Sequence, residues 1–369
     1  MTDARAAPSP RRAAGILVTA AAGPVGQAVV EALAEAGETV VAGMRDPRAR
    51  LADGAKWASG TAAAVTGSRA HGRAGPGRPA GKPVRAPNQK PLHNPAHKPV
   101  PAAAGPASRA LGTPPVGHAD HATAAGVDAR AIVRAVDFAD RGTWPAALAG
   151  VDRVVLIRPL GLTDVARSVI PFIDTAMESG VRQLVLVSPL GPPFDTRSPQ
   201  HAVEQYLKRS RAPYTVVRLN VLLQTLTTVC RDDIRRRNEI VLPAGGARMA
   251  FVDARDAARA IAAVLTEPGH LRKSYTLSGE QALGYREVAG ILTEVLGRTV
   301  DYAAPNEDDY LALLAKQGTP PEQAAALQAG YRAVRRRRAM LPNRSIRRLT
   351  GRPATSVRRF IEDHRDVWL

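Results

Sequence analysis

The sequence contains a single cysteine, Cys230, among its 369 residues. One cysteine excludes a disulfide framework within the chain and a cysteine-based zinc site. Aromatic residues make up only 4% of the chain, so the core must be built from Val, Leu, Ile and Ala. No apolar run approaches the roughly 20 residues that a membrane-spanning helix needs. These shortages predict a cytoplasmic protein that does not cross a membrane.

Basic residues outnumber acidic ones by 51 to 33, which gives a formal net charge of +18. Most of this excess lies in two segments, residues 53–125 and 331–369. A nucleic-acid-binding domain instead concentrates basic residues on one folded face. The charge pattern therefore favours solvated basic segments over a nucleic acid or another polyanion as partner.

Residues 53–125 differ in composition from the rest of the chain. They are rich in Pro, Gly and Ala and show no apolar periodicity, so they cannot bury enough surface to offset the entropy of ordering. We therefore predict a disordered insertion. The segment holds five histidines: His71, His93, His97, His118 and His121. Pro95 separates His93 from His97, which argues against a helical metal-binding pair, and no metal site is predicted.

Apolar, strand-like runs alternate with amphipathic segments through much of the remaining chain. The predicted strands are residues 15–19, 39–44, 131–136, 153–157, 183–187 and 214–219. The predicted helices between them are residues 24–36, 144–149, 165–178 and 199–210. The strands are continuous Val, Leu and Ile runs, which is typical of a parallel sheet with helices on both faces. The pattern predicts an α/β fold with a Rossmann-type, doubly wound parallel sheet.

The pattern changes beyond residue 280. Four helices are predicted there: residues 285–296, 308–316, 321–338 and 356–364. We expect residues 13–280 to form a Rossmann domain interrupted by the insertion. We expect residues 281–369 to form a small, mainly helical lobe that caps the substrate and carries a basic tail.

The first strand leads into a turn rich in small residues. Gly23 and Gly26 occupy the second and third glycine positions of a dinucleotide-binding turn, and Ala20 occupies the first. Pro24 and Val25 then open a helix, whose N-terminus can bind phosphate through free N–H groups and the helix dipole. These five residues are candidate cofactor contacts. The alternative is a plain turn with small residues chosen for packing.

Arg45 follows the second predicted strand directly. An acidic residue at this point would bind the ribose 2′-hydroxyl of NAD, whereas an arginine suits the 2′-phosphate of NADP. Arg45 therefore favours NADP over NAD. A solvated arginine at the start of a loop is the alternative, and the neighbouring Asp46 leaves the question open.

An ordered series of segments resembles the NmrA-like branch of atypical short-chain dehydrogenase/reductases. The segments include ILVTAAAGPVGQAVVEALAEAG, VAGMRDP, AVDFAD, ALAGVDRVVLIRP, GVRQLVLVSPLG, HAVEQYLKRSRAPYTVVRLN and FVDARDAARAIAAVL. The resemblance implies an NADP-binding Rossmann domain with a C-terminal substrate lobe. It also implies contacts from Asp137 and Phe138 to the adenine, and from Arg158 and Ser188 to the rest of the cofactor.

The sequence departs from standard short-chain dehydrogenases in lacking their Tyr-x-x-x-Lys pair. No tyrosine has a lysine four residues later, and the resemblance puts the two positions near Ser198 and Ala202. That pair supplies a proton to a carbonyl oxygen. Without it, His201 and Ser188 are the nearest candidate catalytic residues, and histidine titrates in a suitable range. An ordinary histidine at a helix start is the alternative.

Two functional hypotheses follow, and a minor third one, nucleic-acid binding, rests on charge alone. The first is an NADP-dependent oxidoreductase acting on a small, electrophilic organic molecule such as an iminium ion, a quinone or an enone. The second is a non-catalytic, NADP-binding redox sensor that regulates a partner protein. An enzyme needs an apolar pocket beside the nicotinamide. Candidate lining residues are Leu160, Pro192, Phe194, Val221 and Leu222. The sequence does not indicate an oligomeric state.

Overall fold

The computed structural model describes residues 15–47, 131–190, 196–336 and 339–369. The predicted insertion 53–125, with its five histidines, lies outside the described residues, as do Pro192 and Phe194 of the predicted pocket. Within the described part, no helix combines the length and apolarity that crossing a membrane requires.

A seven-stranded sheet forms the centre of the fold. Its strands, in order across the sheet, are β3 (Ala131–Ala135), β2 (Val40–Met44), β1 (Gly15–Val18), β4 (Val151–Ile157), β5 (Gln183–Pro189), β6 (Tyr214–Leu219) and β9 (Ser274–Leu277). Every pairing between these strands is parallel. The strand order reverses between β1 and β4, and doubly wound folds bind their ligands at the carboxyl edge of the sheet at this point. The predicted Rossmann-type, doubly wound sheet is confirmed.

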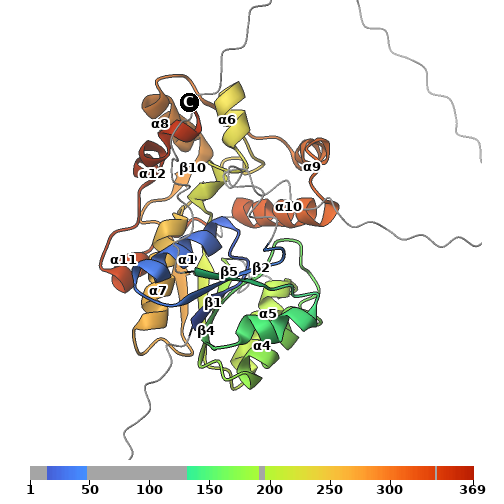
Figure 1. The fold of residues 1–369 in the computed structure, drawn as a ribbon. Coiled ribbons are helices and arrows are strands. Elements are labelled where there is room, and N and C mark those ends of the chain that lie inside the picture. The colour runs from blue at the N-terminus through green and yellow to red at the C-terminus, as the bar shows by residue number, and fades with distance from the viewer. Residues whose placement is uncertain (1–14, 48–130, 191–195, 337–338) are drawn as a thin grey trace, which may run out of the picture. The chain divides into compact units, whose positions relative to one another are not determined.

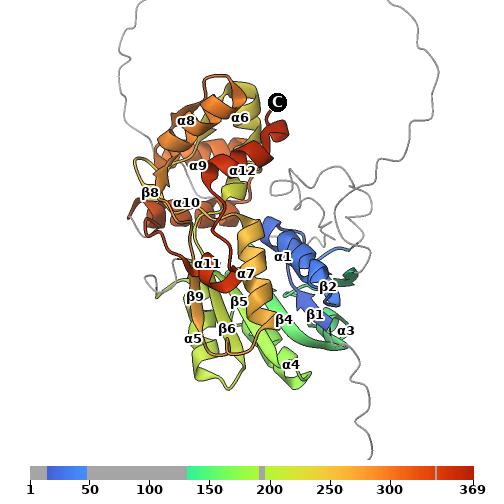
Figure 2. The ribbon, with the colours of Figure 1, turned by 90° about the vertical axis from the view of Figure 1, so that its left-hand side faces the viewer.

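Helices cover both faces of this sheet (Figures 1 and 2). One face carries α1 (Pro24–Glu35) and α7 (Ala254–Thr266), which lie side by side; the other carries α3 (Trp144–Leu148), α4 (Val169–Glu178) and α5 (Pro199–Arg209). Because side chains alternate along a strand, both faces of each central strand must be apolar.

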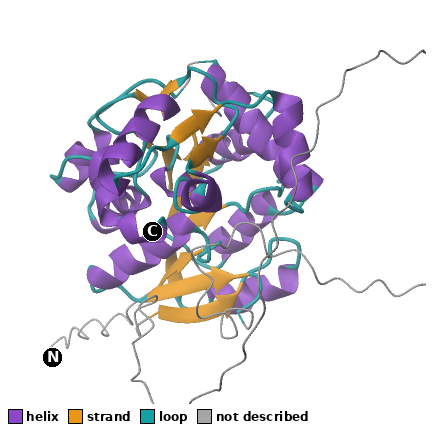
Figure 3. Cartoon of the chain, turned by 90° about the horizontal axis from the view of Figure 1, so that it is seen from above, coloured by secondary structure: helices purple, strands orange, loops and turns teal. Residues whose placement is uncertain are grey.

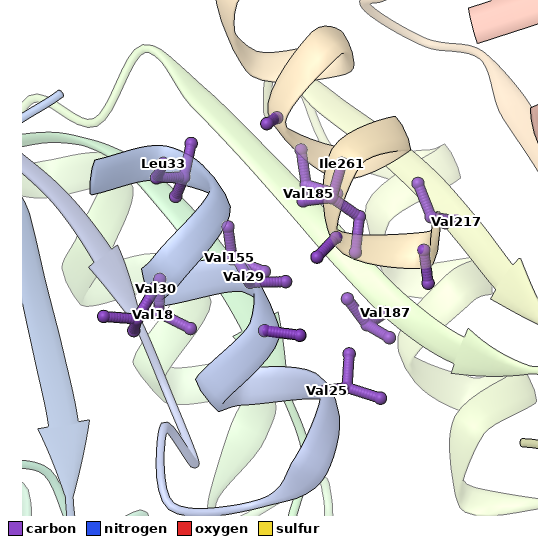
Figure 4. Packing of buried hydrophobic residues seen from close by; sticks show 14 of the residues in the cluster. Val18, Val25, Val29, Val30, Leu33, Val155, Val185, Val187, Val217 and Ile261 are labelled. Atoms are coloured by element: carbon purple, nitrogen blue, oxygen red, sulfur yellow. The ribbon is translucent and has the colours of Figure 1, made fainter. Parts of the chain in front are cut away.

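Strand β1 illustrates this alternation. Ile16 and Val18 belong to the core beneath α1 and α7, whereas Leu17 belongs to the opposite core. Figure 4 shows Val29 of α1 and Ile261 of α7 in the first of these cores. All five side chains are fully buried, and burial of each stabilises the fold by about 1.5–3 kcal/mol.

Helix α7 begins at a buried, charged cap. The Asp253 carboxylate accepts hydrogen bonds from the Arg255 backbone N–H and from Gln224 Nε2, both at 2.9 Å. Burial alone would raise the pKa of Asp253, but the hydrogen bonds from Arg255 and Gln224 outweigh it and hold the pKa below the ordinary 3.8. The cap therefore stabilises the fold when the Asp253 carboxyl is ionised.

A second hydrophobic core joins the C-terminal helices, which Figure 1 draws above the sheet. The helices are α6 (Arg231–Arg237), α8 (Tyr285–Leu296), α9 (Glu307–Lys316), α10 (Pro321–Arg335) and α12 (Val357–Asp363). Two short ribbons join them: β7 (Glu239–Val241) with β11 (Asp301–Ala303), and β8 (Arg248–Met249) with β10 (Leu283–Gly284). Helix predominates over strand in this part (Figure 3). Its core also contains apolar residues between Leu223 and Phe251, before residue 280. The domain boundary expected at residue 280 stays a prediction.

Residues 339–369, most of the segment predicted to carry a basic tail, fold back onto the protein, and the tail itself stays a prediction. Helix α11 (Ser345–Thr350) packs on α7. Trp368 is fully buried, and its Nε1 donates to the Leu226 carbonyl oxygen at 3.1 Å. Arg347 forms an ion pair with Glu280 at 2.9 Å. Apolar anchors and ion pairs thus hold a segment whose charge alone indicated solvation.

Candidate cofactor and substrate site

The end of β1 is fastened to the end of β4 by one buried side chain. Thr19 Oγ1 donates to the Ile157 carbonyl oxygen at 2.9 Å and accepts from the Ile157 N–H at 2.8 Å. These two bonds fix the start of the glycine turn at the point where the strand order reverses. Thr19 was not among the predicted site residues.

The turn after Thr19 is tight and partly strained. Ala20 has a φ of +48°, in the left-handed region where a non-glycine residue costs about 1–2 kcal/mol. The Gly23 N–H donates to the Ala20 carbonyl oxygen at 3.0 Å. A Cβ on Gly26 would lie 2.5 Å from that same oxygen. Gly26 is therefore required for the helix to approach the turn, as the predicted role of this glycine demands.

Helix α1 presents an open N-terminus at this turn. It has neither a side-chain cap nor an acidic residue in its first turn, and Pro24 has no N–H to donate. The N–H groups of Val25 and Gly26 have no acceptor among the described residues, since the first bond runs from Gln27 to Gly23 at 2.9 Å. Free N–H groups and the positive end of the helix dipole fit a phosphate.

Arg45 lies at the tip of β2 beside this turn. The Ala21 N–H donates to the Gly43 carbonyl oxygen at 3.0 Å, which brings the two tips together. Arg45 is exposed and forms no hydrogen bond or ion pair with a residue that the structure describes. Its guanidinium is thus available to a ligand, and the predicted contact with a 2′-phosphate stays a prediction.

The residues predicted to contact adenine follow β3. The Asp137 carboxylate accepts from the Ala139 N–H at 2.9 Å, and Trp144 Nε1 donates to the Asp137 carbonyl oxygen at 2.8 Å. The Phe138 ring is buried and lies edge-on to Phe172, with 5.2 Å between the ring centroids. The ring therefore contributes to the core, and adenine contacts from both residues stay predictions.

Ser188, Glu204 and Arg218 form a buried polar network near the carboxyl edge. Ser188 on β5 and Arg218 on β6 are register partners. Ser188 Oγ donates to Glu204 Oε1 at 2.8 Å, while Arg218 donates to both carboxylate oxygens at 3.0 and 2.5 Å. The hydroxyl proton of Ser188 is therefore directed at Glu204. The catalytic and cofactor roles predicted for Ser188 stay predictions.

His201 lies in the first turn of α5. Its backbone N–H donates at 3.2 Å to the side chain of Ser198, which caps the helix. Ser198, near which the resemblance puts the missing tyrosine, is thus an N-cap. His201 is half-buried one turn before Glu204. The role of His201 as a proton donor stays a prediction.

Arg158 follows the last residue of β4. Its Nε donates to Gln200 of α5, and its Nη1 donates to the carbonyl oxygens of Pro159 and Leu162. Burial lowers the pKa of this guanidinium, which is half-buried. Gln200 is almost fully buried and was not among the predicted site residues. The cofactor contact predicted for Arg158 stays a prediction.

The loop after β4 meets the C-terminal helices. Leu160 is 52% exposed, and Gly161 has a φ of +89° that favours glycine. A Cβ on Gly161 would lie 3.4 Å from Cγ of Gln323, so α10 passes directly over this loop. Val221 and Leu222, which follow β6, are half-buried. Leu160, Val221 and Leu222 thus follow strands β4 and β6 at the carboxyl edge, and an apolar pocket there stays a prediction.

A depression of about 510 Å³ lies at the opposite edge of the sheet, where β4 and β5 begin. Its arginines already have partners, since Arg153 pairs with Glu38 at 2.6 Å and Arg182 pairs with Asp152. In doubly wound folds, ligands bind at the carboxyl edge. This depression is therefore not taken as the functional site.

The strand order, the glycine turn and the open helix start together define a Rossmann-type protein of the dinucleotide-binding class. The model of the NmrA-like family matches residues 119–334, which is more than half of the chain. The chain therefore belongs to the NmrA-like family, and the resemblance found in the sequence is confirmed.

Individual relatives agree with this assignment. The chain is 30% identical over 252 residues to an NAD(P)H azoreductase from Xenophilus azovorans, which covers 66% of this chain and 87% of the relative. It is 29% identical over 248 residues to an agroclavine dehydrogenase from Claviceps fusiformis, with coverages of 64% and 84%.

Two solved structures share the fold. An NADPH-dependent quinone oxidoreductase from Escherichia coli, in complex with NADPH, has a TM-score of 0.65 at 20% identity and covers 94% of this chain and 99% of its own. A triphenylmethane reductase from Citrobacter sp., in complex with NADP(H), has a TM-score of 0.65 at 18% identity, with coverages of 95% and 99%.

Proposed function

We propose that this protein is an NADP-dependent reductase of a small organic substrate. The observation that carries the proposal is the open N-terminus of α1, which follows β1 at the point where the strand order reverses. The names of the relatives support it, because the azoreductase, the quinone oxidoreductase and the triphenylmethane reductase all reduce small molecules with a nicotinamide cofactor.

Different residues at the carboxyl edge would bind different parts of the cofactor. The N–H groups of Val25 and Gly26 would hold the pyrophosphate, and Arg45 would pair with the 2′-phosphate of NADP. When bound, the nicotinamide supplies the hydride. The protein itself would supply orientation, and α10, which lies against the loop after β4, would help to exclude water.

The supply of a proton limits the choice of substrate. The Tyr-x-x-x-Lys pair is missing from the sequence, and the proton of Ser188 is directed at Glu204. His201 is the remaining candidate donor. We therefore expect good turnover of acceptors that are already electrophilic, such as iminium ions, quinones, enones and azo compounds, and slow reduction of plain ketones.

The test measures NADPH oxidation by the purified protein with a quinone, an enone, a cyclic iminium ion and a plain ketone, and repeats each assay with NADH. The proposal requires turnover of at least one electrophilic acceptor and a preference for NADPH. A matched His201→Ala variant should lose ketone reduction and retain iminium reduction. Tight NADPH binding without hydride transfer to any acceptor would contradict the reductase and support the redox-sensor alternative.

A further inference from the structure

The guanidinium of Arg158 lacks a carboxylate partner among the residues that the structure describes. Its three hydrogen-bond acceptors are the Gln200 side-chain oxygen and two backbone carbonyl oxygens, all of them neutral. Its Nη2 makes no hydrogen bond to a described residue. By contrast, the similarly placed Arg218 is paired with Glu204. A half-buried cation without a counter-charge is costly, and an anionic ligand would compensate it.

The direction of the Arg158 side chain separates it from the predicted phosphate site. Gln200 belongs to α5, which follows β5, whereas the glycine turn leads into α1 on the far side of β4. The bond to Gln200 therefore holds the guanidinium on the α5 side of β4 at the carboxyl edge. The open N-terminus of α1 and Arg45 already offer positive groups to the phosphates of a cofactor.

The loop that follows Arg158 carries an exposed apolar side chain two residues later. Leu160 is 52% exposed, an unusual position for a leucine beside a site. The next residue, Gly161, lies against Gln323 of α10. A ligand in this position would meet a cation and an apolar side chain together.

We propose that Arg158 binds an anionic oxygen group, a carboxylate, sulfonate or phosphate, of a substrate whose apolar body packs against Leu160. This inference rests on the proposed reductase function, because it assigns part of the same site. It replaces the cofactor contact that the family resemblance implies for Arg158. Gln200 is the positioning residue, since its oxygen holds Nε and leaves Nη2 for the ligand. Paired N–H groups of arginine match the geometry of such anions.

Two substitutions test the charge without changing the shape of the site greatly. Gln200→Glu places a carboxylate beside the Arg158 guanidinium and compensates its positive charge, while Arg158→Gln removes that charge. Arg158→Lys keeps the charge and should restore part of the binding. Arg209→Gln, on the exposed last turn of α5, is the matched control.

The probe is a pair of azo dyes that differ in one charge: methyl red, which carries a carboxylate, and its neutral methyl ester. Each dye is titrated into NADP⁺-loaded protein and followed by its absorbance, so that no turnover is needed. The wild type should bind methyl red more tightly than the ester. Gln200→Glu and Arg158→Gln should weaken methyl red binding by about 10- to 100-fold and leave the ester unchanged.

A second titration measures NADPH binding by fluorescence without dye. Unchanged NADPH affinity in both variants supports a substrate anion. A loss of NADPH affinity with an unchanged preference between the dyes would overturn the proposal and assign Arg158 to a cofactor phosphate. Equal binding of acid and ester by the wild type would also overturn it. If Arg158→Gln does not fold, the same two titrations are made with Gln200→Glu and Arg158→Lys, and their results decide whether the proposal holds. Failure of hydride transfer would contradict only the reductase function, because these titrations involve no reaction.

Discussion

Replacing Glu204 with alanine removes the only carboxylate that the structure places on the buried guanidinium of Arg218. The Glu204 side chain is 2% exposed and that of Arg218 is 11% exposed, so water cannot take over the lost contacts. The change removes two hydrogen bonds from Arg218, at 3.0 and 2.5 Å, and one from Ser188 at 2.8 Å. What remains is a buried cation and an unpaired hydroxyl.

The expected cost follows from this burial. Removing one partner of a buried ion pair typically destabilises a protein by about 3–5 kcal/mol, because the other charge stays buried. Native proteins have unfolding free energies of only about 5–15 kcal/mol, so the loss would be a large fraction of the total. At about 2–4 °C per kcal/mol for a protein of this size, Tm should fall by roughly 6–20 °C.

Denaturant unfolding, monitored by circular dichroism, measures the change for Glu204→Ala. Glu294→Ala is the matched control, because its ion pair with Arg358 is exposed and worth at most about 1 kcal/mol. A double variant, Glu204→Leu with Arg218→Met, removes both charges and should recover most of the stability. A loss below 1 kcal/mol in Glu204→Ala, or a double variant as unstable as the single one, would refute this reasoning.

Three further predictions concern the turn, the cofactor and pH. Ala20→Gly should stabilise the protein by up to about 1 kcal/mol by relieving the positive φ, whereas Ala22→Gly, in the same turn without a positive φ, should destabilise it by about 0.5 kcal/mol. Thermal unfolding compares them, and an equal loss of stability in both would contradict the strain at Ala20. Arg45→Ala should weaken NADPH binding by about tenfold or more and leave NADH binding unchanged, with the exposed Arg167→Ala as control; equal effects on both cofactors would contradict the 2′-phosphate contact. Because the folded-state pKa of Asp253 is lowered, its contribution is present above pH 3.8 and lost as pH falls below it. Asp253→Asn should therefore reduce the unfolding free energy near neutral pH by about 1–3 kcal/mol and flatten its decline in acid, and an unchanged decline would contradict this assignment.

The central sheet could be predicted from the sequence because its strands are long, continuous apolar runs. The runs at residues 153–157 and 214–219, for example, lie within β4 and β6. The edge strand β9 was missed, since Ser274–Leu277 has only one fully buried residue and carries no such signal. The ribbons of two or three residues were missed because so few residues cannot show a periodicity.

The glycine turn could also be predicted, because its features are local. Gly26 approaches the backbone of Ala20, only six positions earlier, and Pro24 marks the start of the helix. The hydrogen bonds of Thr19 and Gln200, in contrast, join residues that are far apart in the sequence. Thr19 bonds Ile157 across 138 positions of sequence. No local pattern specifies such a partner.

One signal in α5 could have indicated the missed residues. Gln200, Val203, Glu204 and Leu207 are its buried residues, spaced as one helical stripe. Two of these four are polar, and a polar side chain in a core stripe requires a buried partner. The sequence therefore implied partners for Gln200 and Glu204 without identifying them.

The partners show what α5 does in the absence of a Tyr-x-x-x-Lys pair. Gln200 holds Arg158 at the end of β4, and Glu204 joins Ser188 of β5 to Arg218 of β6. One face of α5 thus fixes the ends of three adjacent strands, and it does so with side chains that accept hydrogen bonds from those strands. Substitutions on this face should therefore alter how a substrate is held, whereas His201, which directly follows Gln200 in α5, stays the predicted proton donor.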